Sequence, residues 1–167
     1  MSSERHPLQI TTPSDCELVL TRVFDAPAAL VFDALTLPEH VRRWWPCEGS
    51  TMDACEIDLQ VGGTYRYLMV LPDGFEVPFR GEYREISRPD RLVYTEVFDV
   101  EPHRHHPALV TMLLTESGGS TTMTTTVLHD SRESRDAHLN SGMESGAAEC
   151  YKRVDVILSE MIQANSL

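Results

Sequence analysis

The stretch that most constrains this chain lies near its C-terminus, at residues 141–163. Apolar and small side chains recur there every three or four positions, at Met143, Ala147, Cys150, Val154, Ile157 and Met161. This spacing is typical of one face of an α-helix, and about 22 residues make a rod roughly 33 Å long. Ser141 and Glu144 have the spacing of a capping box, which predicts the helix start. No second helix of similar length is predicted, so a sheet has to cover the apolar face.

The preceding chain reads as strands joined by short turns. Alternating side chains predict seven strands, at residues 16–24, 52–60, 64–71, 75–86, 91–100, 108–116 and 121–128. Short turns force antiparallel pairing, and no strand–helix–strand rhythm suggests a parallel sheet. Two short helices are expected after the first strand, around Leu30–Leu35 and at residues 39–44, and another at residues 130–139. Residues 1–14 are polar and are predicted to be a flexible lead, followed by a single domain at residues 15–167.

Composition excludes several classes of protein. The net charge is −12, which disfavours nucleic acid as a partner because phosphate binding needs a basic surface. No apolar run reaches the roughly 18 residues of a membrane span, so no membrane insertion is expected. The N-terminus lacks an apolar signal core, and a cytoplasmic location with reduced cysteines is therefore expected.

Two groups of side chains contain potential metal ligands. The four cysteines, Cys16, Cys47, Cys55 and Cys150, lack the local spacing of a zinc site. His103, His105 and His106, with Asp99 or Glu101, have side chains suited to zinc or nickel, although prolines at both ends favour a solvated loop. Neither pattern predicts a metal site, and no cofactor is predicted.

Several segments, in order, resemble one known family. They are Phe24-Asp25-Ala26-Pro27, Val31-Phe32-Asp33-Ala34, Pro38-Glu39, Trp44-Trp45-Pro46, residues 59–67 around Gly62-Gly63, Pro72-Asp73-Gly74, residues 81–86, residues 89–93 and residues 142–146. The chain is similar to the START-like (SRPBCC) superfamily, and within it to the activator of heat-shock-protein ATPase homologue-like (AHSA-like) family. The resemblance covers roughly residues 16 to 163. Relatives commonly carry Trp near the start of the long helix, where this chain has Ala147.

The resemblance implies an α+β helix-grip (START/Bet v-like) fold, in which a curved antiparallel sheet of about seven strands surrounds the C-terminal helix. It also implies a cavity between sheet and helix, which relatives use for lipids, polyketides, hormones or other apolar molecules. Ala147 in place of Trp is expected to enlarge this cavity, unless a neighbouring aromatic side chain fills the space. Pairing of two copies through an exposed strand edge is compatible with this architecture.

Strand alternation indicates which side chains share the interior face. These are Tyr65, Tyr67 and Met69; Phe79, Gly81 and Tyr83; Leu92, Tyr94, Glu96 and Phe98; Val110, Met112 and Leu114; and Met123, Thr125 and Val127. Trp44 and Trp45 are expected near the cavity mouth, one of them packing and the other bordering the entrance. The predicted ligand-binding residues are Trp44, Tyr65, Tyr67, Met69, Phe79, Tyr94, Glu96, Phe98, Met112, Met143, Ala147 and Tyr151. Ordinary core packing is the alternative for each of them.

Glu96 is the most informative of these residues. Its alternation places it between Tyr94 and Phe98 on the interior face, unless the register is offset and the side chain is exposed. A buried carboxylate is unfavourable unless it is paired, and its pKa tends to rise. Such a group binds a polar part of a ligand or acts as a general acid or base.

Three hypotheses follow for the function. The first is a protein that binds a small apolar, aromatic or lipid-like molecule in an internal cavity. This hypothesis assigns no catalytic residue and favours a non-enzymatic role. The second is a cyclase-, aromatase- or hydrolase-like enzyme acting on polyketide-like substrates through Glu96 and the tyrosines. The third, which rests on the family resemblance alone, is a co-chaperone or stress-response protein.

Overall fold

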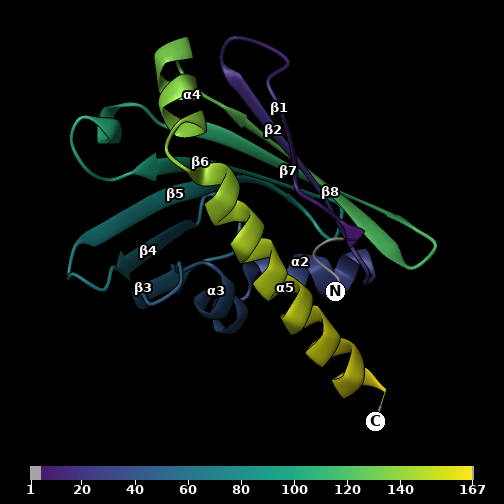
Figure 1. Cartoon of the computed structure of the whole chain (residues 1–167). Helices are drawn as coiled ribbons and strands as arrows, with labels where there is room; N and C mark the ends of the chain where they lie inside the picture. The colour runs from purple at the N-terminus through teal and green to yellow at the C-terminus, as the bar shows by residue number, and fades with distance from the viewer. Residues whose placement is uncertain (1–4, 167) are drawn as a thin grey trace.

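The chain folds as one antiparallel sheet crossed by a long helix. The computed structural model describes residues 5–166. The strands are β1 (Gln9–Thr11), β2 (Glu17–Phe24), β3 (Thr51–Ile57), β4 (Thr64–Val70), β5 (Glu76–Ser87), β6 (Arg91–Phe98), β7 (Ala108–Ser117) and β8 (Ser120–Leu128). The helices are α2 (Ala28–Thr36), α3 (Pro38–Trp44), the short 3-10 helix η1 (His103–His105), α4 (Arg132–Leu139) and α5 (Met143–Asn165). Figure 1 shows α5 lying diagonally across the sheet, with α2 and α3 on the same side.

The sheet order places β2 and β3, which are consecutive in sequence, far apart in the sheet. The order is β1-β2-β8-β7-β6-β5-β4-β3, with every neighbouring pair antiparallel. Because β2 pairs with β8, the connection that carries α2 and α3 crosses from one end of the sheet to the other. The predicted helix-grip fold is confirmed, with eight strands in place of seven.

The additional strand lies in the expected lead. Residues Gln9–Thr11 pair with Val19–Thr21 of β2, so part of residues 1–14 is an edge strand. Residues 1–4 of that lead lie outside the described part of the chain. A strand of three residues, with only Ile10 partly buried, has too few side chains to show a clear alternation.

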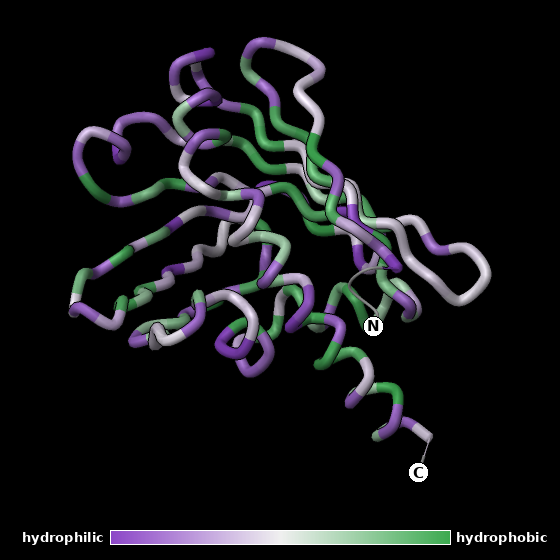
Figure 2. The backbone as a smooth tube through the Cα atoms, viewed as in Figure 1, coloured by the Kyte–Doolittle hydropathy of each residue, from purple (hydrophilic) through white to green (hydrophobic). Residues whose placement is uncertain are grey.

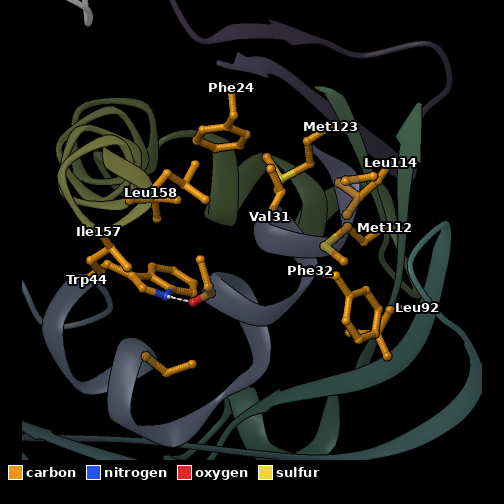
Figure 3. Packing of buried hydrophobic residues seen from close by; sticks show 14 of the residues in the cluster. Phe24, Val31, Phe32, Trp44, Leu92, Met112, Leu114, Met123, Ile157 and Leu158 are labelled. Carbon is orange, nitrogen blue, oxygen red and sulfur yellow. Dashed lines mark hydrogen bonds between the residues drawn. The ribbon is translucent and has the colours of Figure 1, made fainter. Parts of the chain in front are cut away.

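Two clusters of buried side chains hold α5 on the sheet. The larger one joins β2, α2, α3 and the C-terminal half of α5, and includes Phe24, Phe32, Trp44, Ile157 and Leu158 (Figure 3). The smaller one joins Leu18, Leu20, Ala108, Val110 and Val127 with Met143 and Ala147 of α5. Figure 2 shows hydrophobic positions gathered on the central strands and hydrophilic positions in the connecting loops.

The predicted capping box at the start of α5 is wrong. Gly142 is the N-cap residue, its φ is +84°, and no side chain caps the helix there. The Ser141 hydroxyl instead donates to the His138 carbonyl oxygen at 2.6 Å, at the end of α4. The left-handed backbone at Gly142 favours glycine and turns the chain between the two helices.

One buried ion pair fixes the position of α5 across β2. Arg22 faces inward from β2, with only 2% of its side chain exposed, and makes two hydrogen bonds to Asp155, at 2.9 and 2.6 Å. The guanidinium also donates to the Val23 carbonyl oxygen at 2.7 Å. This pairing satisfies a charge that would be unfavourable in isolation inside the sheet.

Candidate functional site

A small cavity lies between the sheet, α2, α3 and α5. It offers about 70 Å³ to the centres of water-sized atoms, which is room for roughly five water molecules. Seven of its fourteen lining residues are aromatic. The lining comprises Leu35, Thr36, Trp44, Trp45, Tyr65, Tyr67, Tyr83, Leu92, Tyr94, Glu96, Met112, Met123, Thr125 and Tyr151.

Helices α2 and α3 bring one wall to the sheet. The Glu116 carboxylate accepts from the Ala28 backbone N–H at 2.8 Å, which fixes the start of α2. The Trp44 indole N–H donates to the Ala34 carbonyl oxygen at 2.8 Å, which joins α3 to α2 (Figure 3). Arg153 of α5 donates to the carbonyl oxygens of Trp44 and Pro46, so the two tryptophans are held at the end of α3.

Tyrosine side chains on β4, β5 and β6 form the opposite wall. The Tyr65 ring centroid lies 4.9 Å from that of Tyr67, 5.6 Å from that of Tyr83 and 5.7 Å from that of Tyr94. The Trp45 ring packs 4.9 Å from Tyr67 and closes this group toward α3. Burial is the main cause that raises the pKa of each of these four phenols, so they stay neutral through the physiological range.

Gly81 makes the position of Tyr65 possible. It pairs directly with Tyr65 across β4 and β5, and a Cβ atom there would lie 1.9 Å from the Thr95 carbonyl oxygen and 2.5 Å from the Tyr65 ring. The ring therefore crosses β5 over the glycine, and its hydroxyl donates to the Thr95 carbonyl oxygen of β6 at 2.8 Å. That bond uses the hydroxyl proton and leaves the phenol oxygen as an acceptor.

Glu96 is the one charged residue among the fourteen that line the cavity. Burial raises the pKa of its carboxyl group to about 7, and no hydrogen bond or cation from residues 5–166 offsets this effect. In residues 5–166, every side-chain oxygen or nitrogen that is fully shielded from solvent has a hydrogen-bond partner. The Glu96 oxygens have no such partner, so they are not fully shielded and border open space. The carboxyl group is therefore directed into the cavity without a protein partner.

Four phenol groups that line the cavity are influenced by the charge of this carboxyl group. After burial, the Glu96 charge is a further cause that raises the pKa of Tyr65, Tyr67 and Tyr94. It also acts on Tyr151 of α5, where burial is again the main cause of a raised pKa. Electrostatic coupling weakens with distance, so the four phenols and the carboxyl group share one polar centre.

The predicted ligand-binding residues fall into two groups. Those that line the cavity are Trp44, Tyr65, Tyr67, Tyr94, Glu96, Met112 and Tyr151, whereas Met69, Phe79, Phe98, Met143 and Ala147 do not. Phe79 and Phe98 stack on each other at 5.1 Å, and the Met69 sulfur accepts from the Cys47 backbone N–H at 3.3 Å. Whether any of the twelve binds a ligand remains a prediction.

The first turns of α5, which carry Met143 and Ala147, lie away from the cavity. Met143 and Ala147 pack against the smaller cluster around Leu18 and Val110, and Tyr151 is the one residue of α5 in the cavity wall. The small side chain at Ala147 therefore adds no space to the cavity, contrary to the expectation from sequence.

The histidine-rich loop has separate partners for each ring. His103 stacks on Phe98 at 5.2 Å, His105 pairs with Glu101 at 2.9 Å, and His106 pairs with Asp130 at 2.7 Å. Among residues 5–166, no group of three His, Cys, Asp or Glu side chains is placed to hold a metal ion. In the same range, no helix is long and apolar enough to cross a membrane.

Comparison with known proteins identifies the family. The sequence profile described as "Activator of Hsp90 ATPase homolog 1-like protein" matches residues 25–159. The chain belongs to this family. The match includes the whole cavity lining, from Leu35 to Tyr151. No curated protein matches the chain by sequence.

Several solved structures share the fold of this chain. A protein from Rhodobacter sphaeroides has a TM-score of 0.84 and 28% identity, covering 92% of this chain and 99% of its own. A protein from Nitrosomonas europaea has a TM-score of 0.79 and 24% identity, covering 91% and 99%. The AHSA1-like protein from Aeromonas hydrophila has a TM-score of 0.65 and 19% identity, covering 83% and 93%.

Some of the other residues that line the cavity can be predicted from sequence patterns, whereas others cannot. Tyr83, Leu92, Met123 and Thr125 lie on the interior faces that strand alternation predicts. Leu35 and Thr36 end α2, and nothing in their spacing indicates that the helix end borders a cavity. Trp44 and Trp45 both line the cavity, with Trp44 buried in the larger cluster and Trp45 only partly buried.

Proposed function

We propose that this protein binds a small molecule in the cavity between its sheet and α5. The observation that carries the proposal is the Glu96 carboxyl group, which has no protein partner and faces a cavity walled by aromatic rings. An unpaired carboxyl group that is at least half-buried is unfavourable for folding, so its presence is explained if a ligand completes its hydrogen bonds. Largely apolar walls with a few polar groups are the usual composition of ligand sites.

The size of the cavity limits the ligand. Space for roughly five water molecules admits about five to seven non-hydrogen atoms without movement of the walls. A compact aliphatic or aromatic molecule therefore fits better than the lipid-like or polyketide-like ligands of other branches. For those, the walls would have to move apart.

Titration with neutral probes tests the proposal. Butan-1-ol and phenol are added to the ¹⁵N-labelled protein, and chemical shifts of the Trp44 and Trp45 indole N–H groups are followed. Millimolar to micromolar binding is expected, since ligands this small gain at most about 1.5 kcal/mol per non-hydrogen atom. Shift changes spread evenly over the surface, or none at all, would refute a cavity site.

Two bulky variants provide the matched control. Leu35→Trp adds an aromatic ring to the cavity wall and should weaken binding of both probes at least tenfold. Ala147→Trp adds the same ring outside the wall, next to Leu18 and Val110, and should leave binding within about twofold. Equal effects of the two variants would place the probes elsewhere on the protein.

A second candidate function is general acid–base catalysis on the bound molecule. It is favoured by the same carboxyl group, which borders the cavity with a pKa of about 7 and can both accept and donate a proton near neutral pH. If a substrate is turned over, Glu96→Gln should lower kcat by at least a hundredfold. Intact turnover in this variant would exclude Glu96 as the acid or base.

A further inference from the structure

The polar centre of the cavity contains hydrogen-bond acceptors that have no donor within the described part of the protein. The carboxylate of Glu96 accepts hydrogen bonds, and the Tyr65 oxygen is left as an acceptor because its proton is donated to the Thr95 carbonyl oxygen. Thr36 is likewise committed, since its hydroxyl donates to the Phe32 carbonyl oxygen at 2.7 Å. A ligand with several N–H groups complements the Glu96 carboxylate and the Tyr65 oxygen.

The charges around the cavity favour a cation. No Lys, Arg or His is among its fourteen lining residues, so an anion would meet Glu96 without a compensating positive charge. The nearby Arg22, whose charge reaches Tyr151, is already held by both oxygens of Asp155. Electron-rich tyrosine and tryptophan rings, which make up half of the lining, also attract cations.

From these contacts we infer that the ligand is a small primary ammonium ion, whose N–H groups bind the Glu96 carboxylate and the neighbouring phenol oxygens. This inference rests on the proposed function and names the ligand's chemical class. An ammonium group has three donors, which match one carboxylate and one or two phenol oxygens. The lining of the cavity provides no positive charge next to Glu96. The ion pair between the Glu96 carboxylate and the ammonium group therefore forms only when the ligand binds.

Binding should depend on pH in a direction set by Glu96. The titratable groups that line the cavity with it are the phenols of Tyr65 and Tyr67 on β4, Tyr83 on β5, Tyr94 on β6 and Tyr151 on α5, all with a raised pKa and neutral below pH 9. The residues from α2, α3, β7 and β8 that line the cavity do not titrate. Glu96 is therefore the one group of the wall that changes charge between pH 5.5 and 8.

The test compares three probes of one shape: n-butylamine, butan-1-ol and butyrate. Each has about five non-hydrogen atoms, and they differ in charge at the end of the same chain. At pH 8 the amine should bind at least tenfold more tightly than the alcohol, and butyrate should bind least. Amine affinity should rise about thirtyfold from pH 5.5 to 8 as Glu96 ionises near pH 7, while alcohol affinity stays within a few fold.

Two variants distinguish the effect of the Glu96 charge from the effect of the protein's net charge. Glu96→Gln keeps the shape of the wall and should abolish both the preference for the amine and its pH dependence. Glu76→Gln removes the same charge from an exposed position of β5 and should leave both unchanged, apart from a small effect on a chain of net charge −12.

Each outcome bears on one of the two proposals. If the alcohol binds in the cavity but the amine is not preferred, the ammonium inference is wrong and the binding function stands. An amine preference that survives in Glu96→Gln also overturns the inference, because the site would then lie elsewhere. If none of the three probes binds the cavity, the proposed function itself fails.

Discussion

Replacement of Glu96 by glutamine should stabilise the protein at neutral pH. The unfolded chain releases the Glu96 proton near pH 4.5, whereas the folded protein retains it up to about pH 7. Between these values the folded state binds more protons than the unfolded state, so the free energy of unfolding decreases as the pH rises. Glutamine removes this dependence because it carries no ionisable proton.

The size of the effect follows from the shift in pKa. A change from 4.5 to about 7 corresponds to about 3 kcal/mol of unfolding free energy at pH 8, at 1.36 kcal/mol per pH unit. Below about pH 4.5 both side chains are neutral, and the two proteins should have equal stability. For a chain of this length, about 3 kcal/mol raises Tm by roughly 6 to 12 °C.

Urea unfolding, followed by far-UV circular dichroism, measures the difference at pH 5, 6, 7 and 8. Acid-induced loss of other carboxylate interactions cancels between the two proteins, which leaves the contribution of Glu96. Glu76→Gln, at an exposed position of β5, should show a pH-independent difference near zero. A constant difference between Glu96→Gln and the parent protein across this range would refute the argument that Glu96 is buried without a partner.

Three other substitutions give predictions for stability, two of them destabilising and one stabilising. Asp155→Ala should cost about 3 to 5 kcal/mol in urea unfolding, because Arg22 loses its buried partner, and replacing both residues by Met and Leu should recover most of it. A loss below 1 kcal/mol would show that water reaches Arg22. Gly81→Ala should lower Tm strongly, since its Cβ would clash with the Thr95 carbonyl oxygen, whereas Gly146→Ala, with nothing within 4 Å, should stabilise α5 by up to about 1 kcal/mol. Similar Tm values for the two alanine variants would contradict the close approach at Gly81.

The sequence was sufficient to predict which side chains point inward. Strand alternation has a period of two, so it places Tyr65, Tyr94 and Glu96 on the interior face, with an offset register as the alternative for Glu96. It could not predict how far along each strand the cavity extends. Met69, Phe79 and Phe98 share those faces but lie outside the cavity wall, with Met69 and Phe79 packed under the segment that follows α3. That boundary depends on the crossing of α3 and α5, which is a tertiary feature.

Local patterns at the chain ends were less informative. The S-x-x-E spacing at Ser141 and Glu144 fits a capping box, but the adjacent Gly142 adopts a left-handed conformation and becomes the N-cap instead. A glycine next to a capping signal offers two competing helix starts, and the packing of α4 against α5 decides between them. The short strand Gln9–Thr11 is held mainly by backbone pairing with β2, which no side-chain pattern reveals.

The position of the cavity follows from how one helix meets two cores. The C-terminal half of α5 packs with α2 and α3, while its N-terminal half packs directly on β2, β7 and β8. Tyr94 and Tyr151 contact both clusters, so they lie where the two packing arrangements meet and the interior is not completely filled. A protein selected for stability alone would place an apolar side chain on β6 at that junction. This chain has Glu96 there, which lowers the free energy of unfolding by about 3 kcal/mol near neutral pH. Such a loss of stability is expected at a position where the side chain binds a ligand.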